Sequence, residues 1–144
     1  MGRLTAMIKQ FQEIDFSFRL ELLIDYAENL PELPEKYRKA KEAGINQIHE
    51  CQTPVFLWAE YSGEKVILIA DAAPEAPTVR GYVAFLVDLL SGMTPEEIEA
   101  IPNDLLNQLG LAQHLGMMRI QGLSAILPRI KREVRSAVKD KKKS

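Results

Sequence analysis

The sequence predicts an α+β domain in which helices pack against a small antiparallel three-stranded sheet. A strand-like hairpin over 55–70 lies in the middle of the chain, and the segments on both sides of it show helical apolar spacing. The resulting order of two helices, three strands and three helices favours segregated helices and strands over a parallel β-α-β arrangement. With 144 residues and no internal repeat, the chain is expected to form one domain over 1–144.

The N-terminal part of the chain is predicted to form two helices followed by an exposed segment. Apolar residues at helical spacing indicate a first helix over 3–13 and a second helix that begins at an N-cap, Asp15 or Ser17. The second helix should end in the stretch Leu-Pro-Glu-Leu-Pro at 30–34, because a residue before proline is disfavoured in the helical region. The polar segment 36–43 is expected to form a short turn or helix.

The predicted sheet follows this segment. Aromatic and β-branched residues mark strands over 55–61 and 65–70, which the turn 62–64 with its central glycine joins as a hairpin. A third, shorter strand is expected at 47–50. Because the apolar runs of the hairpin are nearly continuous, helices should cover one face of the sheet and part of the other.

The segment after the hairpin is predicted to be helical. Thr78 is a candidate N-cap for a central helix that Gly92 closes. Thr94 and Glu97 have the spacing of a capping box at the start of the next helix. A short helix near 103–109 and a loop at 110–116 should follow.

The last helix is expected to begin near Met117 and to extend past Arg129, with a kink at Pro128. The segment 139–144, which contains four lysines, is predicted to form a flexible basic tail.

Composition and charge exclude several classes of function. The formal net charge of −2 argues against general nucleic-acid binding, which requires a basic face. A single cysteine cannot form an intramolecular disulfide, so a reducing cytoplasm is the expected location. The first residues lack the apolar core of a secretory signal, and no apolar stretch approaches the ~20 residues that span a bilayer. We therefore expect no contact with nucleic acid or with a membrane.

The single cysteine, Cys51, is the main candidate for chemistry. If the chain is extended here, His49 shares a face with Cys51 and would favour the thiolate, whereas Glu50 points the other way and disfavours it. From these residues alone, a buried structural cysteine is the simplest alternative. A Cys-His hydrolase is disfavoured because no Gly-rich oxyanion loop is present. A metal site is disfavoured because Cys-x-x-Cys and His-x-x-x-His spacings are absent.

Arg119, between Met118 and Ile120, is a second candidate. It is either a solvated helix residue or a functional cation that stabilises a thiolate or persulfide, or that contacts a partner's carboxylate.

Four segments form a recognisable series along the chain. They are the Leu-Pro-Glu-Leu-Pro stretch, the cysteine segment 47–57, the pair of helix starts at 76–81 and 93–98, and the stretch 109–115 with Arg119 and Gly122-Leu123. In this order they resemble the SufE family of sulfur-acceptor proteins. Together they span 14–132, nearly the whole chain. The resemblance implies a SufE/NifU-like α+β sandwich and a role in iron–sulfur cluster assembly.

Carried over residue by residue, the resemblance assigns Cys51 as the thiol that takes sulfur from a desulfurase persulfide. It places Gln52 directly after this thiol and gives Arg119 a partner-binding or anion-stabilising role. His114 falls in the family's His-Leu pair, where we expect a structural role at the end of a helix. His49 and Glu50 remain supporting candidates next to the thiol.

The chain departs from the common family pattern around the cysteine. Glu50 stands where the family places glycine, and Thr53 where it places serine, with Pro54 next. Pro54 should stiffen the cysteine loop, and Glu50 removes a permissive backbone position. The loop after the second strand also differs, with Asp71 and Glu75 around Pro74, and we expect Glu75 to influence partner preference.

The resemblance implies a covalent sulfur acceptor and desulfurase activator rather than a stand-alone enzyme. Its expected partners are a cysteine desulfurase, which supplies its own pyridoxal phosphate, and an iron–sulfur scaffold protein. The chain itself should hold no cofactor and no metal, and it should be a monomer or a weak homodimer. The alternative is a SufE-like regulatory module that binds a desulfurase without carrying sulfur.

Overall fold

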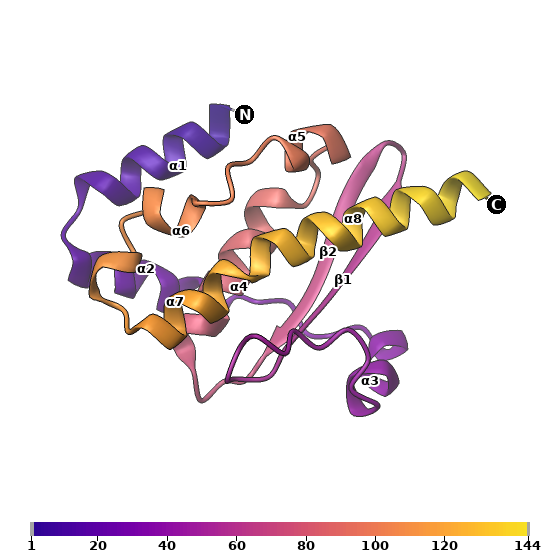
Figure 1. Cartoon of the computed structure of the whole chain (residues 1–144), viewed down its shortest axis with the longest axis horizontal. Helices are drawn as coiled ribbons and strands as arrows, with labels where there is room; N and C mark the ends of the chain where they lie inside the picture. Colours follow the sequence, from indigo (N-terminus) through magenta and orange to yellow (C-terminus); the bar gives the residue numbers. More distant parts are fainter. Residues whose placement is uncertain (1, 144) are drawn as a thin grey trace.

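The computed structural model describes residues 2–143, with His114 and Lys143 described by their backbone alone. Its helices and strands, in chain order, are α1 (Gly2–Glu13), α2 (Phe16–Glu28), α3 (Glu35–Glu42), β1 (Val55–Ser62), β2 (Lys65–Ala72), α4 (Pro77–Leu90), α5 (Pro95–Glu99), α6 (Leu105–Gln108), the 3-10 helix η1 (Ala112–His114), α7 (Met117–Ser124) and α8 (Ile126–Lys143) (Figure 1). The α+β class is therefore confirmed. In the described residues, no helix is long and apolar enough to cross a bilayer.

The core lies between the hairpin and the helices that pack on one of its faces. Helix α4 packs against β2, α8 packs against β1, and α2 packs on α4. The ring of Phe85 in α4 meets Phe11 edge-on and also Tyr26, each with 5.4 Å between ring centroids. In Figure 1, α8 crosses the hairpin at an angle, while α1 and α2 lie on the opposite side of α4. The central helix α4 is thus enclosed on several sides, which explains its nearly continuous burial.

A glycine permits the close approach of α2 to α4. A Cβ atom on Gly81 would lie 2.1 Å from the backbone oxygen of Leu23 and 2.9 Å from its Cβ. Side chains cannot occupy that space, so the two helices can pack this closely only with glycine at position 81.

The two strands form an antiparallel hairpin in which Val55 lies opposite Ala72. Burial alternates along β2, but the first four residues of β1 are all buried. The reason is α3, whose Tyr37 ring stands 4.9 Å from the Trp58 ring on the outer face of the sheet. The expectation that helices cover one face and part of the other is met.

The predicted third strand is absent, because the chain turns away from the sheet too early. Gln47 forms an isolated bridge with Phe56, and the Ile48 amide donates to the Val55 carbonyl. The Cys51 amide then donates to the carbonyl of Ile48 and closes a turn. The sheet of the described chain therefore has two strands, not three.

Helix starts follow the local chemistry with one correction. The capping box at Thr94 and Glu97 is present as predicted. Helix α4, however, begins at Pro77 with Ala76 as N-cap rather than at Thr78, because proline is already set for the first helical turn. The cap of α2 is Asp15, whose backbone carbonyl accepts from the amides of the first turn.

The C-terminal region consists of two helices rather than one kinked helix. Helix α7 ends at Ser124 and α8 begins at Ile126, so the break lies before Pro128. Pro128 sits in the first turn of α8, where its missing N–H removes no helical hydrogen bond. Helix α8 continues to Lys143, through most of the segment predicted as a flexible tail, and Ser144 lies outside the described residues.

Candidate functional site

Cys51 lies at the tip of a turn that rests on α7. Its side chain is buried, with 8% of the residue exposed, and its thiol donates a hydrogen bond to the backbone carbonyl of Gly122 over 3.2 Å. The segment on which it sits, 49–53, contains turns and bends rather than regular structure. The thiol is therefore held inside the protein by a loop and not by a rigid element.

Burial makes this thiol a poor acid. Loss of solvation raises the pKa of Cys51 from 9.0 to about 11, and the charge of the adjacent Glu50 contributes a smaller rise. At pH 7 a thiol with this pKa is ionised in about one molecule in 10⁴. Because the thiolate is the nucleophile, the sheltered form of Cys51 is a weak nucleophile at this pH.

A cavity adjoins the thiol and continues the site outward. Its volume is about 40 Å³, and residues of α4 and α7 form its inner wall. A larger cleft of about 410 Å³ lies beside it between the cysteine loop and the loop that follows β2. Gln52, Thr53, Val79 and Arg119 line both spaces, so the cavity at Cys51 and the cleft adjoin across these residues and together form a depression.

Three of the sequence-predicted site residues gather around this depression. Gln52 lines it directly after the cysteine, and its amide contacts the Met118 sulfur over 3.5 Å. Arg119 and Glu75 face the cleft from α7 and from the loop after β2. The cleft therefore carries one cation and one carboxylate, on walls that come from α7 and from the loop between β2 and α4.

The remaining sequence-predicted residues lie elsewhere. His49 and Glu50 are exposed on the turn, and in the described structure no hydrogen bond joins His49 to Cys51. The expectation that both share one strand face is wrong, since residues 49–51 are not extended. Glu50 does not have a positive φ angle, so its backbone conformation does not require glycine. His114 closes η1 in the segment predicted as a loop, and its side chain lies outside the described part of the structure.

The start of the cysteine loop is fixed by a polar network with α8. The Asn46 amide donates to the Glu133 carboxylate over 2.7 Å and to the Leu57 carbonyl over 3.0 Å. Arg129 pairs with the same carboxylate over 3.3 Å and also donates to the Gln47 carbonyl. The loop therefore leaves a rigid base before it reaches Cys51.

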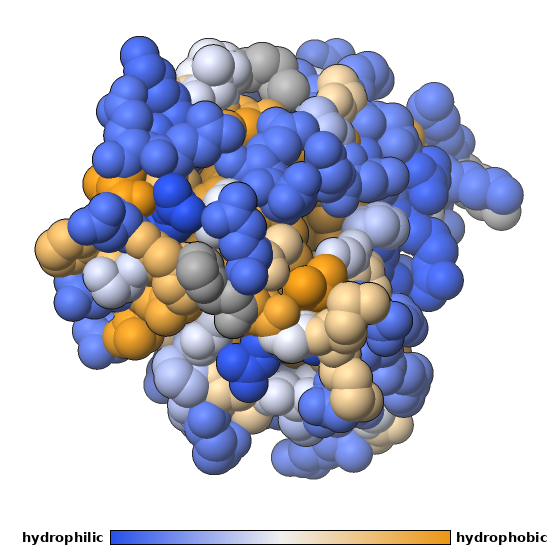
Figure 2. All heavy atoms as spheres, turned by 60° about the vertical axis from the view of Figure 1, so that its left-hand side comes forward, coloured by the Kyte–Doolittle hydropathy of each residue, from blue (hydrophilic) through white to orange (hydrophobic). Residues whose placement is uncertain are grey.

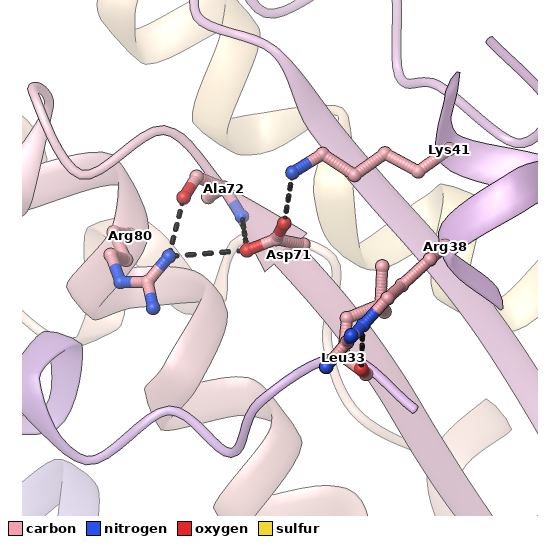
Figure 3. A network of polar contacts seen from close by, with 6 residues as sticks. All are labelled: Leu33, Arg38, Lys41, Asp71, Ala72 and Arg80. Atoms are coloured by element: carbon pink, nitrogen blue, oxygen red, sulfur yellow. Dashed lines mark hydrogen bonds and ion pairs between the residues drawn. The ribbon is translucent and has the colours of Figure 1, made fainter. Parts of the chain in front are cut away.

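A second network fixes the opposite wall of the cleft (Figure 3). Arg80 of α4 donates to the Ala72 carbonyl over 2.5 Å and pairs with Asp71 over 3.2 Å. It also donates to the Ala27 carbonyl at the end of α2, and Lys41 of α3 reaches the other oxygen of Asp71. Four elements thus meet where the loop over 73–76 begins.

The face that carries the start of α7 is partly apolar (Figure 2). Met117 and Met118 are 72% and 62% exposed, and Phe18 at the start of α2 is 53% exposed. Exposed flexible methionines suit adaptable contacts with another protein.

No group of three His, Cys, Asp or Glu side chains that could hold a metal occurs in the described residues.

Residues 5–134 match the SufE family, described as an Fe-S metabolism associated domain. This chain belongs to the SufE family. It is 36% identical over 135 residues to an uncharacterized SufE-like protein of Mycobacterium tuberculosis, covering 93% of this chain and 92% of that protein. It is also 25% identical to the cysteine desulfuration protein SufE of Plasmodium falciparum, covering 90% of this chain and 52% of that protein.

A solved structure shares this SufE fold. The solution structure of a hypothetical protein from Thermus thermophilus superposes with a TM-score of 0.81 at 31% identity, covering 94% of this chain and 96% of that one. Chloroplastic quinolinate synthase of Nicotiana tabacum contains a related segment, 28% identical over 114 residues, which is 15% of its length. The likeness therefore extends over the whole SufE domain and also to a domain inside a larger enzyme.

Sequence reasoning did not assign Gly122 to the SufE site, although it noted Gly122-Leu123 among the family-like stretches. The partner of the Cys51 thiol is a backbone carbonyl 71 positions away. Every residue has a backbone carbonyl, so the sequence does not mark which one accepts from the Cys51 thiol. The family-like stretch that contains Gly122 was the one signal that could have pointed to it.

Proposed function

We propose that Cys51 accepts a sulfur atom from the persulfide of a cysteine desulfurase and carries it to a scaffold protein for iron–sulfur cluster assembly. Membership of the SufE family supports the connection with Fe–S metabolism. The observation that carries the proposal is the sheltered lone thiol beside a cavity of about 40 Å³. One water occupies about 30 Å³ of liquid, so one added atom of similar size, such as sulfur, fits beside Cys51.

The transfer is a thiol–persulfide exchange. The thiolate of Cys51 attacks the outer sulfur of the desulfurase persulfide, forms a new S–S bond and breaks the old one. The desulfurase cysteine leaves as a thiolate, so charge and atoms balance without an oxidant or reductant. A second exchange of the same kind passes the sulfur to a thiolate of the acceptor and returns Cys51 to the thiolate.

The geometry supports a cycle of closed and open loop positions. In the closed position burial raises the pKa of the thiol, which protects it from side reactions. Reaction then requires the loop to leave α7 and place Cys51 in the pocket of a partner. Arg119, on the wall of the cleft, supplies a positive charge that stabilises a thiolate or persulfide during this movement.

The chain is proposed to hold no resident cofactor, because the pyridoxal phosphate belongs to the desulfurase. A regulatory module that binds a desulfurase without carrying sulfur is the second candidate. The exposed methionines beside the cleft would serve either function, whereas the sheltered thiol and its cavity serve sulfur carriage alone.

Mass spectrometry of the intact protein separates these two functions. The chain is incubated with a cysteine desulfurase and free cysteine, then trapped with an alkylating agent and weighed. Because Cys51 is the single cysteine, a gain of one sulfur atom that disappears in Cys51→Ser assigns the carrier. Stimulation of the desulfurase without any gain of sulfur would refute carriage and establish the regulatory module.

A further inference from the structure

We propose that Gly122 is the positioning residue that seats the Cys51 loop and keeps the thiol sheltered. Gly122 lies in the last turn of α7, in ordinary helical conformation. Its backbone therefore does not need glycine, and within a helix alanine is favoured over glycine by up to about 1 kcal/mol. The reason for glycine must lie in what surrounds it.

The space in front of Gly122 is occupied by the cysteine loop. A Cβ atom on Gly122 would lie 3.3 Å from the Cys51 Cα, 3.3 Å from the Glu50 carbonyl oxygen and 3.7 Å from the Cys51 sulfur. The first two distances are shorter than ordinary van der Waals contact. A side chain of any size on this residue therefore forces the loop or the helix to move by a few tenths of an ångström.

The same residue supplies the hydrogen bond that closes the site. The Gly122 carbonyl accepts from the Cys51 thiol, and Gly122 also lines the cavity next to the sulfur. Close approach, the hydrogen bond and the cavity thus depend on one position. Displacing the loop here lengthens the hydrogen bond and opens the cavity towards the cleft.

The loop, not the helix, is the part that yields. In the described structure two side-chain hydrogen bonds join the loop to α7, one from Cys51 to Gly122 and one from Gln52 to Met118. Helix α7 has its own backbone hydrogen bonds and packs against α8. A turn held by two weak sulfur contacts moves at lower cost than a packed helix.

The inference deepens the proposed function, since a seated loop would also shelter the carried sulfur. A persulfide in the cavity beside Gly122 would be shielded from small reductants until a partner draws the loop out. The seating itself can be measured without a desulfurase or a persulfide. If Cys51 carried no sulfur, Gly122 would still seat the loop. If Gly122 did not seat the loop, Cys51 would still be able to carry sulfur.

The test is the pH profile of alkylation of Cys51 by iodoacetamide in Gly122→Ala, with Gly116→Ala as the matched control. Gly116 is the N-cap of the same helix, and a Cβ atom there meets nothing within 4 Å. We expect the apparent pKa of the thiol in Gly122→Ala to fall from about 11 towards 9.0. A full release of two pKa units corresponds to an increase of about 100-fold in the thiolate fraction at pH 7.

Gly116→Ala should keep the wild-type profile. The inference is overturned if Gly122→Ala keeps the wild-type pKa and rate, or if both variants change alike. Far-UV circular dichroism and thermal melting establish that each variant is folded. A Gly122→Ala chain that fails to fold would show that the loop cannot yield, and this result also overturns the inference.

Discussion

Replacing Arg80 with alanine should cost the fold about 3 kcal/mol of unfolding free energy. Arg80 donates to two backbone carbonyls, at the end of α2 and at the end of β2, and it pairs with Asp71. A hydrogen bond from a charged group contributes about 1.5–3 kcal/mol, and the lower value applies because this side chain is 22% exposed. Two such bonds account for the estimate, and the partly exposed ion pair with Asp71 is counted as adding little.

Urea unfolding, followed by far-UV circular dichroism and by Trp58 fluorescence, measures this loss. Arg3→Ala is the matched control, because it removes an arginine whose ion pair with Asp88 is more than half exposed. The control should lose about 0.5 kcal/mol, in line with surface ion pairs. If Arg80→Ala were no less stable than Arg3→Ala, the contacts of Arg80 in Figure 3 would not hold these elements together.

Two further predictions concern stability. Gly81→Ala should lose about 3 kcal/mol of unfolding free energy in the same assay, because its Cβ would overlap the Leu23 carbonyl. The control Gly116→Ala should stay within about 1 kcal/mol of the wild type. Equal losses in the two variants would contradict the close packing of α2 on α4. The raised pKa of Cys51 stabilises the fold below pH 9, and this contribution is lost as the pH rises from 9 to 11. Relative to Cys51→Ser, the chain should lose up to about 3 kcal/mol over that interval, and parallel stability curves for the two proteins would disprove the burial of the thiol.

The fold class, the hairpin and most helices could be predicted because each leaves a periodic or capping signal in the chain. The third strand could not be excluded in this way. Residues 47–50 look like a strand, but a turn closed by the Ile48 carbonyl competes with extension of the sheet. The break between α7 and α8 also lacks a local signal, since Ala125 is a good helix former.

The candidate site was predictable where residue type carries the chemistry. A lone cysteine, its neighbouring glutamine and an arginine are visible in the sequence, and all three line one depression. The relation between His49 and Cys51 was not predictable, because it depends on whether the chain is extended there. The role of Gly122 depends on distance in the folded chain, which no local pattern records.

The anchored base of the cysteine loop limits how far Cys51 can travel. Ile48 is fully buried, its amide is bonded to Val55, and it lies three residues before Cys51. A fully extended chain spans about 3.4 Å per residue, so the tether keeps Cys51 within about 10 Å of Ile48. Under the proposed carrier function, so short an arm cannot reach two partners that are bound at separate places. Donor and acceptor would have to visit the same face in turn, and an excess of either should competitively slow the delivery of sulfur by the other.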